Sequence, residues 1–417
     1  MKSLIALNNK IIGRLWAALT LSCVGAEIYT FAIVWIATAR FGSDSSYLIA
    51  LQAAIVLIST LTSGAFTDGF SNKSMMLLSD ISRFIITLVP FICWQLTGNV
   101  STSLLVGVIV IVSYFRPIFD PALQAILPAI SSKPSELQTI NGLFDVVRRI
   151  ARIAGPALAA FMFTVISVYD FFLINALTYL VSAIFILTVS KELSALEHGR
   201  TPTNRTGGFV QNNLQAISGG FKALNKQFAV NYHLIAYAFC NGGWYISLVV
   251  GLALKMHINF PDKSEYFGYV LGVYGIFNVI SNLIFSELSI HRPVLAMSAG
   301  RILSGIALLM MAFSNSLPLI MLFAALAAVG APITQLPLAT LMQTRFARDE
   351  IVKVFRCRMF YEWLFLLLAL LIAPTLINLV GLQTVMLLSA SCYLLLGFIG
   401  IYTTHDEPSE YLQVEKK

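Results

Sequence analysis

The 417 residues are 58% hydrophobic, only 11% of them are Asp, Glu, Lys or Arg, and the mean hydropathy is +0.81. Soluble domains carry about 25% charged residues, so this composition excludes an ordinary soluble enzyme or binding domain. The formal charge of +7 would suit nucleic-acid binding only if the basic residues formed a patch.

Apolar stretches long enough to cross a bilayer recur along the chain. A helix needs about 20 apolar residues to span the hydrocarbon core. The stretches lack the strict alternation of barrel strands, so they predict an all-α membrane protein. We predict twelve transmembrane helices, at residues 12–39, 46–67, 74–97, 101–127, 139–166, 169–190, 230–255, 266–287, 294–313, 317–342, 357–379 and 382–403.

The longest hydrophilic stretch separates the sixth span from the seventh. Its composition predicts a cytosolic linker at 191–229, with one surface helix around 209–226. The expected domains are an N-terminal six-helix half at 1–190 and a C-terminal six-helix half at 230–417. Two parallel six-helix halves are typical of one large class of secondary transporters.

The basic residues alternate between the two sides of the predicted spans. Most lie before the first span, in every second loop and in the linker, whereas the other side holds only Arg40, Lys255 and Lys263. Cytoplasmic loops carry the excess of Lys and Arg, so both termini are expected in the cytoplasm. The charge is thus a topology signal and does not support nucleic-acid binding. The N-terminus shows no pattern of a cleaved signal peptide.

Three ionisable residues lie deep inside predicted spans, where insertion costs at least about 2.5–3.5 kcal/mol. Glu27 has no basic residue within a turn, so it is either a proton-binding carboxylate or a protonated side chain bonded to a neighbouring helix. Arg116 stays charged and demands a partner or water. Asp120 follows at helical spacing, although Pro117 and Pro121 disturb it. The two charges indicate either a cavity wall that contacts substrate or protons, or an intrahelical ion pair.

The fifth span begins with charges and continues with small residues. Asp145 and Arg149 are four residues apart and are expected to pair near the cytosolic face. Gly155 allows close approach of another helix, and Pro156 adds a bend. In the seventh span Trp244 and Tyr245 form either an aromatic wall for an organic substrate or ordinary packing around a glycine-rich kink.

Several catalytic and cofactor motifs are absent from the sequence. It has no phosphate loop, no HExxH, no clustered Cys and His ligands and no nucleophile elbow. We therefore expect that the protein is not an enzyme, binds no cofactor or metal, and does not use ATP directly. The five cysteines lie singly and predict no disulfide framework.

Three segments carry a family resemblance. The first, at 64–83, is similar to the loop motif Gly-x3-Asp-Arg-x2-Arg-Arg…Asp-x2-Arg of the major facilitator superfamily, although Gly69 and Asn72 replace basic residues. The matching positions are Gly64, Asp68, Lys73, Asp80 and Arg83. In the family this loop is a charge-relay latch that holds one access state, so the resemblance implies a gating role for these five residues together with Asp145 and Arg149.

The second segment, at 115–161, resembles the drug:proton antiporter branch that includes macrolide exporters and the enterobactin exporter. The positions that match are Arg116, Pro121, Ala122, Leu127, Pro128, Leu137, Asn141, Gly155 and Pro156. Glu27 takes roughly the place of an acidic residue of that branch. The third segment lies between the tenth and eleventh spans and resembles the branch's Pro-x-x-x-Arg-Gly-Arg-Val-Phe stretch. Val354 and Phe355 match it, but its Arg-Gly-Arg is absent.

The resemblance implies the superfamily fold and proton-coupled efflux of a small organic compound or drug by alternating access. Glu27 and Asp120 are the expected proton-coupling residues, and Arg116, Trp244 and Tyr245 the expected substrate cavity, at a central site between spans one, four, seven and ten. We expect a monomer in a bacterial inner membrane, with protons, lipid and a small molecule as partners. The alternatives are a siderophore exporter or importer, a non-transporting sensor or scaffold with a transporter fold and, remotely, an enzyme that acts on lipids.

Overall fold

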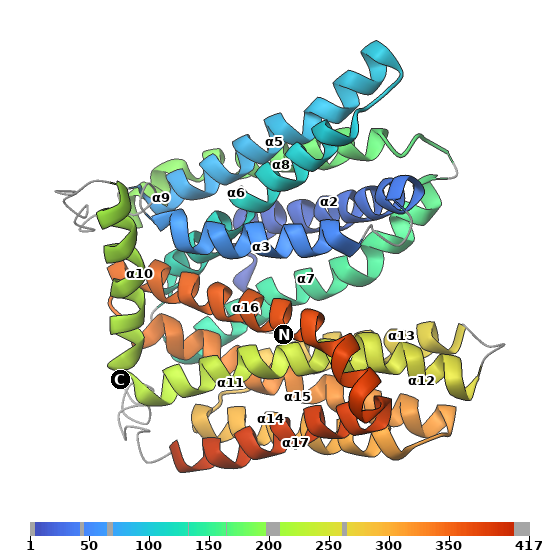
Figure 1. The fold of residues 1–417 in the computed structure, drawn as a ribbon. Coiled ribbons are helices and arrows are strands. Elements are labelled where there is room, and N and C mark those ends of the chain that lie inside the picture. The colour runs from blue at the N-terminus through green and yellow to red at the C-terminus, as the bar shows by residue number, and fades with distance from the viewer. Residues whose placement is uncertain are drawn as a thin grey trace. The chain divides into compact units, whose positions relative to one another are not determined.

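The computed structural model describes residues 5–41, 46–64, 70–131, 133–163, 165–196, 209–260 and 265–403. The regular elements within these ranges are helical (Figure 1). They are α2 (Lys10–Phe41), α3 (Ser46–Thr62), α5 (Asn72–Thr97), α6 (Thr102–Ile130), α7 (Pro134–Phe163), α8 (Asp170–Thr188), α9 (Ser190–Leu196), α10 (Phe209–Asn225), α11 (Phe228–Trp244), the π-helix η2 (Tyr245–Gly251), α12 (Leu252–Asn259), α13 (Glu265–Glu287), α14 (Pro293–Phe313), α15 (Leu317–Thr344), α16 (Arg348–Val380) and α17 (Leu382–Tyr402).

Ten helices in the described part of the chain are long and apolar enough to cross a membrane. They coincide with ten of the twelve predicted spans, and the all-α membrane class is confirmed. The predicted second span appears as α3, whose apolar part is short, and the predicted fifth span appears as α7, which carries several charged residues. The surface helix expected near 209–226 is present as α10.

Local sequence sets the turn between α5 and α6. Gly98 ends α5 with a φ of +67°, a left-handed conformation that glycine adopts without a steric penalty, and its N–H donates to the Trp94 carbonyl. Ser101 then caps α6, because its hydroxyl accepts a hydrogen bond from the Leu104 N–H. This turn fixes the position of the Val100 carbonyl, which the first span binds.

The chain divides into two compact units, each made of segments that are not contiguous in sequence. Unit 1 comprises Met1–Ser131, Leu143–Phe221 and Phe346–Met359, and unit 2 comprises Ser132–Gly142, Lys222–Arg345 and Phe360–Lys417. The divisions fall inside α7, α10 and α16, so each of these three helices contributes to both units. The predicted domain boundaries at 190 and 230 stay a prediction.

Each unit has an apolar core of its own. In unit 1, α8 packs against α2 and α5, and the buried rings of Tyr29 and Phe172 meet edge to face with centroids 5.7 Å apart. In unit 2, α14 packs against α15 and α17, around buried residues such as Leu308 and Met311. These cores hold the helices that carry the charged and aromatic residues of the candidate site.

Corresponding helices of the two units use cations in similar ways. Arg40, at the end of α2, donates to the Val100 carbonyl at 2.7 Å, and Lys255, in the middle of α12, donates to the Ala312 carbonyl at 2.7 Å. Both cations therefore tie the end of a first span to the end of a third span. This correspondence is consistent with an internal repeat of the six-helix pattern.

Candidate functional site

Glu27 lies on α2 at a close contact with α7. A Cβ atom added at Gly155 would lie 2.3 Å from the Glu27 Cβ, so only glycine permits this approach. The Glu27 side chain is partly exposed, and it makes no hydrogen bond or ion pair with any residue that the structure describes. An ionisable group without a partner in a membrane span is a functional-site candidate.

Asp120 on α6 pairs with Arg148 on α7. The Arg148 guanidinium donates to the Asp120 carboxylate at 2.6 Å, and the two side chains are 41% and 24% exposed for Asp120 and Arg148. The intrahelical pair of Asp120 with Arg116 that the spacing suggested is therefore wrong. The carboxylate turns towards α7 because Arg148 offers a charge-assisted bond at hydrogen-bond distance.

Arg116 has an exposed side chain on α6 and forms no ion pair with the described residues. Its charge nevertheless acts on Cys23 and Tyr29 of α2 and on Asp120. A guanidinium stays charged, so this one requires water or a ligand. The predicted role of Arg116 in a cavity wall stays a prediction.

Four charges from three helices converge near the Cys23 thiol, and we call them the charged cluster. Glu27, Arg116, Asp120 and Arg148 are all near enough to act electrostatically on Cys23. They come from α2, α6 and α7, all within unit 1. Two carboxylates and two guanidiniums give this cluster a formal charge of zero.

Asp145 and Arg149 form the pair that their spacing predicts. Two guanidinium nitrogens of Arg149 lie 2.6 and 2.7 Å from one Asp145 oxygen, and each side chain is 13% exposed. Arg148 and Arg152 also act on this carboxylate. Three arginines on one helix thus act on a single, partly buried aspartate.

The loop motif after α3 is anchored inside unit 1. Asp80 is fully buried, accepts from Arg83 at 2.6 Å, and receives a second hydrogen bond from the Ser182 hydroxyl of α8 at 2.6 Å. The Arg83 guanidinium also lies over the ring of Tyr179, 4.3 Å from its centroid. Gly64 is buried just after α3. The predicted gating residue Asp68 lies outside the described residues.

Among the described residues, Lys73 binds two hydroxyls and no carboxylate. Its ammonium donates to Ser190 at 3.1 Å and to Ser194 at 2.8 Å, both on the short helix α9. The same helix is held by an ion pair between Lys10 and Glu192. The basic residue of the loop motif therefore docks the start of the linker.

Trp244 and Tyr245 lie where α11 passes into the π-helix η2. Their rings meet edge to face with centroids 4.9 Å apart, and the Tyr274 ring lies 5.7 Å from that of Trp244. The indole N–H of Trp244 is buried without a hydrogen-bond partner among the described residues. Buried donors are normally satisfied, and π-helical turns are frequent at functional sites, so this N–H is available to a ligand or water.

A buried polar seam at the start of α7 was not foreseen from the sequence as a functional element. Asn141 donates to the Gln343 side-chain oxygen at 2.6 Å, and Gln343 donates back to the Asn141 oxygen at 3.2 Å. Asn141 also donates to the Thr340 hydroxyl at 3.3 Å. This reciprocal amide pair joins α7 to α15 within unit 2.

The same seam continues onto α13. Gln138 donates to the carbonyls of Phe285 and Leu288 at 2.7 and 2.6 Å. Carbonyls at the C-terminal end of a helix such as α13 lack a donor within the helix, and the Gln138 amide supplies one. A Cβ at Gly142 would lie 2.0 Å from the Ser286 Cβ. Asn141 was noted only as part of a family pattern, and amides in an apolar helix were the one sequence signal for the seam.

Comparisons with known proteins agree with this architecture. The family model described as Major Facilitator Superfamily matches residues 15–356. The chain is 24% identical over 308 residues to the uncharacterised MFS-type transporter YfiS of Bacillus subtilis, covering 72% of this chain and 69% of the relative. It is 24% identical over 321 residues to the multidrug efflux pump Tap of Mycobacterium tuberculosis, covering 74% and 73%.

A third relative is the staphyloferrin A transporter of Staphylococcus aureus, 25% identical over 282 residues, with 66% of each chain covered. Among solved structures, a bacterial homologue of the iron transporter ferroportin matches with a TM-score of 0.77 at 15% identity, covering 94% of this chain and 98% of that one. This likeness concerns the fold alone. The family match over most of the chain shows that this protein belongs to the Major Facilitator Superfamily and is a multi-pass membrane transporter rather than an enzyme.

Proposed function

We propose that this transporter exports small organic compounds in exchange for protons, by alternating access. The observation that carries the proposal is Glu27, a mid-span carboxylate without a partner among the described residues, which acts on the same Cys23 thiol as the exposed guanidinium of Arg116. The multidrug efflux pump Tap, a relative along three quarters of the chain, supports an exporter of drug-like compounds. The indole N–H of Trp244, which has no hydrogen-bond partner among the described residues, supports a hydrogen bond to such a compound.

Protonation of Glu27 changes the charge that a substrate meets. The charged cluster carries two negative and two positive groups, so its formal charge is −2 + 2 = 0 when Glu27 is ionised and +1 when it is protonated. A ligand shifts a conformational equilibrium only by binding the two states differently. A cationic compound binds the ionised state better, so proton entry and compound release favour each other, as antiport requires.

The polar seam supplies contacts that alternating access must break. We propose that the start of α7 leaves α13 and α15 when the transporter changes state. The Asn141–Gln343 amide pair then exchanges its mutual bonds for water, which satisfies both amides. Buried amides suit a reversible contact because they are stable when paired and are readily solvated when exposed.

The test measures proton movement driven by substrate in proteoliposomes. With Glu27→Gln, an added cationic dye is expected to exchange across the membrane without moving protons, because the amide cannot titrate. The matched control is Glu192→Gln, an exposed carboxylate on α9, which should leave coupling intact. Proton movement of wild-type size in Glu27→Gln would rule out Glu27 as the proton-coupling carboxylate.

A siderophore transporter is the second candidate, and the relative that supports it is the staphyloferrin A transporter. An anionic chelate binds the protonated cluster better than the neutral one, so the same charge argument predicts that chelate and proton move together. The sign of coupling separates the candidates. Opposite movement of protons and a cationic dye favours the exporter, whereas joint movement of protons and an iron chelate favours the siderophore transporter.

We further propose a monomer in a bacterial inner membrane with both termini in the cytoplasm. The distribution of Lys and Arg along the sequence supports this orientation. Fusion of alkaline phosphatase to the C-terminus tests it, since that enzyme is active only outside the cytoplasm. An active fusion would reject the orientation.

A further inference from the structure

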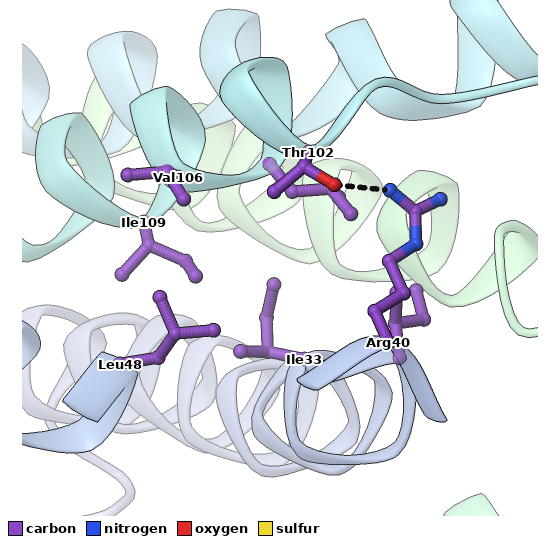
Figure 2. Close-up of a pocket in the computed structure, with 8 residues that line it drawn as sticks. Ile33, Arg40, Leu48, Thr102, Val106 and Ile109 are labelled. Atoms are coloured by element: carbon purple, nitrogen blue, oxygen red, sulfur yellow. Dashed lines mark hydrogen bonds between the residues drawn. The ribbon is translucent and has the colours of Figure 1, made fainter. Parts of the chain in front are cut away.

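A small groove opens in unit 1 between α2, α3 and α6 (Figure 2). Its walls are mostly aliphatic and include Ile33, Leu48, Val106 and Ile109. Arg40 lies at one end of the groove. Lys10, at the opposite end of α2, contacts α9 through Glu192, so the groove lies about 45 Å along the helix from the linker contact, at a rise of about 1.5 Å per residue.

Arg40 is held in place by neutral groups. Its guanidinium donates to the Thr102 hydroxyl at 3.2 Å, to the Val100 carbonyl at 2.7 Å and to the Tyr169 hydroxyl at 3.1 Å. No carboxylate of the described residues lies within ion-pair distance of it. A guanidinium has five N–H donors, so these three bonds orient the group and leave donors for an anion.

We propose that this groove binds an anionic phospholipid, with its phosphate on Arg40 and part of an acyl chain along the aliphatic wall. The groove presents one cation at the end of a hydrocarbon strip, which matches an anionic head joined to a hydrocarbon tail. Arginine is weakly hydrated and matches the geometry of phosphate oxygens. A small soluble anion would leave the aliphatic wall uncovered, whereas the bilayer supplies the lipid at high local concentration.

Lys255 provides an internal comparison. It is the corresponding cation of unit 2, but it is only 8% exposed and its ammonium binds the Ala312 carbonyl. A buried lysine bound to a backbone carbonyl ties two helices together without offering its charge to the bilayer. Arg40 also binds a backbone carbonyl, but its side chain is partly exposed and lines the groove. The lipid site is therefore assigned to Arg40 alone of this pair.

The experiment titrates the purified full-length protein with phosphatidylglycerol or phosphatidylcholine of the same acyl chains and follows binding by native mass spectrometry. The wild type is expected to prefer phosphatidylglycerol by about five-fold, the usual effect of one basic residue near an anionic lipid. Arg40→Gln should bring the two affinities within about two-fold. Lys255→Gln is the matched control and should keep the preference.

Val106→Phe tests the groove without touching any bond of Arg40. It should weaken the binding of phosphatidylglycerol while the melting temperature stays near that of the wild type. An undiminished preference in a folded Arg40→Gln protein, or unchanged binding in Val106→Phe, would overturn the proposal. Competition by glycerol 3-phosphate at the same concentration as the lipid would also overturn it, since the site would then bind free phosphate.

Discussion

Glu27 on α2 and Gly155 on α7 lie so close that a single methyl group would not fit between them. The added Cβ at position 155 would lie 2.3 Å from the Glu27 Cβ and 3.1 Å from its Cγ. The sequence pointed to both residues for separate reasons, one as an isolated carboxylate and the other as part of a Gly-Pro pattern. Their contact places the small residue of α7 directly against the proposed proton-binding side chain.

The contact predicts that Gly155→Ala impairs transport. The methyl must push Glu27 or the helices apart, and overpacking of this kind costs about 1–3 kcal/mol. We expect a clear loss of substrate-driven proton movement in proteoliposomes. Gly107→Ala on α6 is the matched control, because its added Cβ meets nothing within 4 Å, and it should retain activity. Normal coupling in Gly155→Ala would show that the position of Glu27 tolerates displacement.

The bond between Asp120 and Arg148 predicts coupled effects of mutation. Both side chains are partly exposed, so Asp120→Asn should lower the free energy of unfolding by only about 1 kcal/mol. Transport should fall much further, because Arg148 is left unpaired in the charged cluster. A double-mutant cycle with Arg148→Gln, read out as transport rate, should show effects that do not add. Additive effects would indicate that the two residues act separately.

The polar seam predicts a mutation and its rescue. Gly142→Ala places a methyl 2.0 Å from the Ser286 Cβ, so α7 cannot keep its position on α13. We expect reduced transport and a lower melting temperature. Ser286→Gly removes the opposing Cβ, and the double variant should recover much of both properties. Failure of this rescue would place the defect of Gly142→Ala elsewhere.

The buried pair of Asp80 and Arg83 predicts a large loss of stability. Removing one partner of a buried ion pair costs about 3–5 kcal/mol, because the remaining charge is left without compensation. Asp80→Asn should therefore lower the melting temperature in detergent strongly. Glu136→Gln is the comparison, since Lys133 and Glu136 form an exposed pair that should contribute almost nothing. Equal shifts in the two variants would contradict the burial argument.

The linker contact predicts a pH dependence outside the membrane. The hydrogen bond from Lys10 lowers the pKa of Glu192 below its ordinary value of 4.5. A lowered pKa in the docked state means that the contact is fully present above pH 4.5 and is lost as the pH falls through the lowered pKa. Amide hydrogen exchange of α9 should speed up in that acidic range. Glu192→Gln should remove this step, and a step that persists in the variant would assign it to another group.

Much of the fold followed from the sequence because the bilayer imposes simple rules. Apolar length identifies a spanning helix without any knowledge of its neighbours, and ten of the twelve predicted spans appear as such helices. The two exceptions have local causes: α3 is short in its apolar part, and α7 carries several charges. Gly64, Lys73, Asp80 and Arg83 were recognisable because the loop motif has a fixed spacing.

The partner of Asp120 was decided by the tertiary structure alone. Helical spacing placed Asp120 with Arg116, but the carboxylate binds Arg148, which is 28 residues away on α7. Sequence spacing describes neighbours on one helix, whereas an ion pair forms with whichever cation the packing of helices brings within reach. The same reason hid the amide pair of Asn141 and Gln343, which are 202 residues apart. The sequence by itself thus identified the ionisable residues that are costly inside a membrane, whereas tertiary packing determined which of them are paired and with which partner.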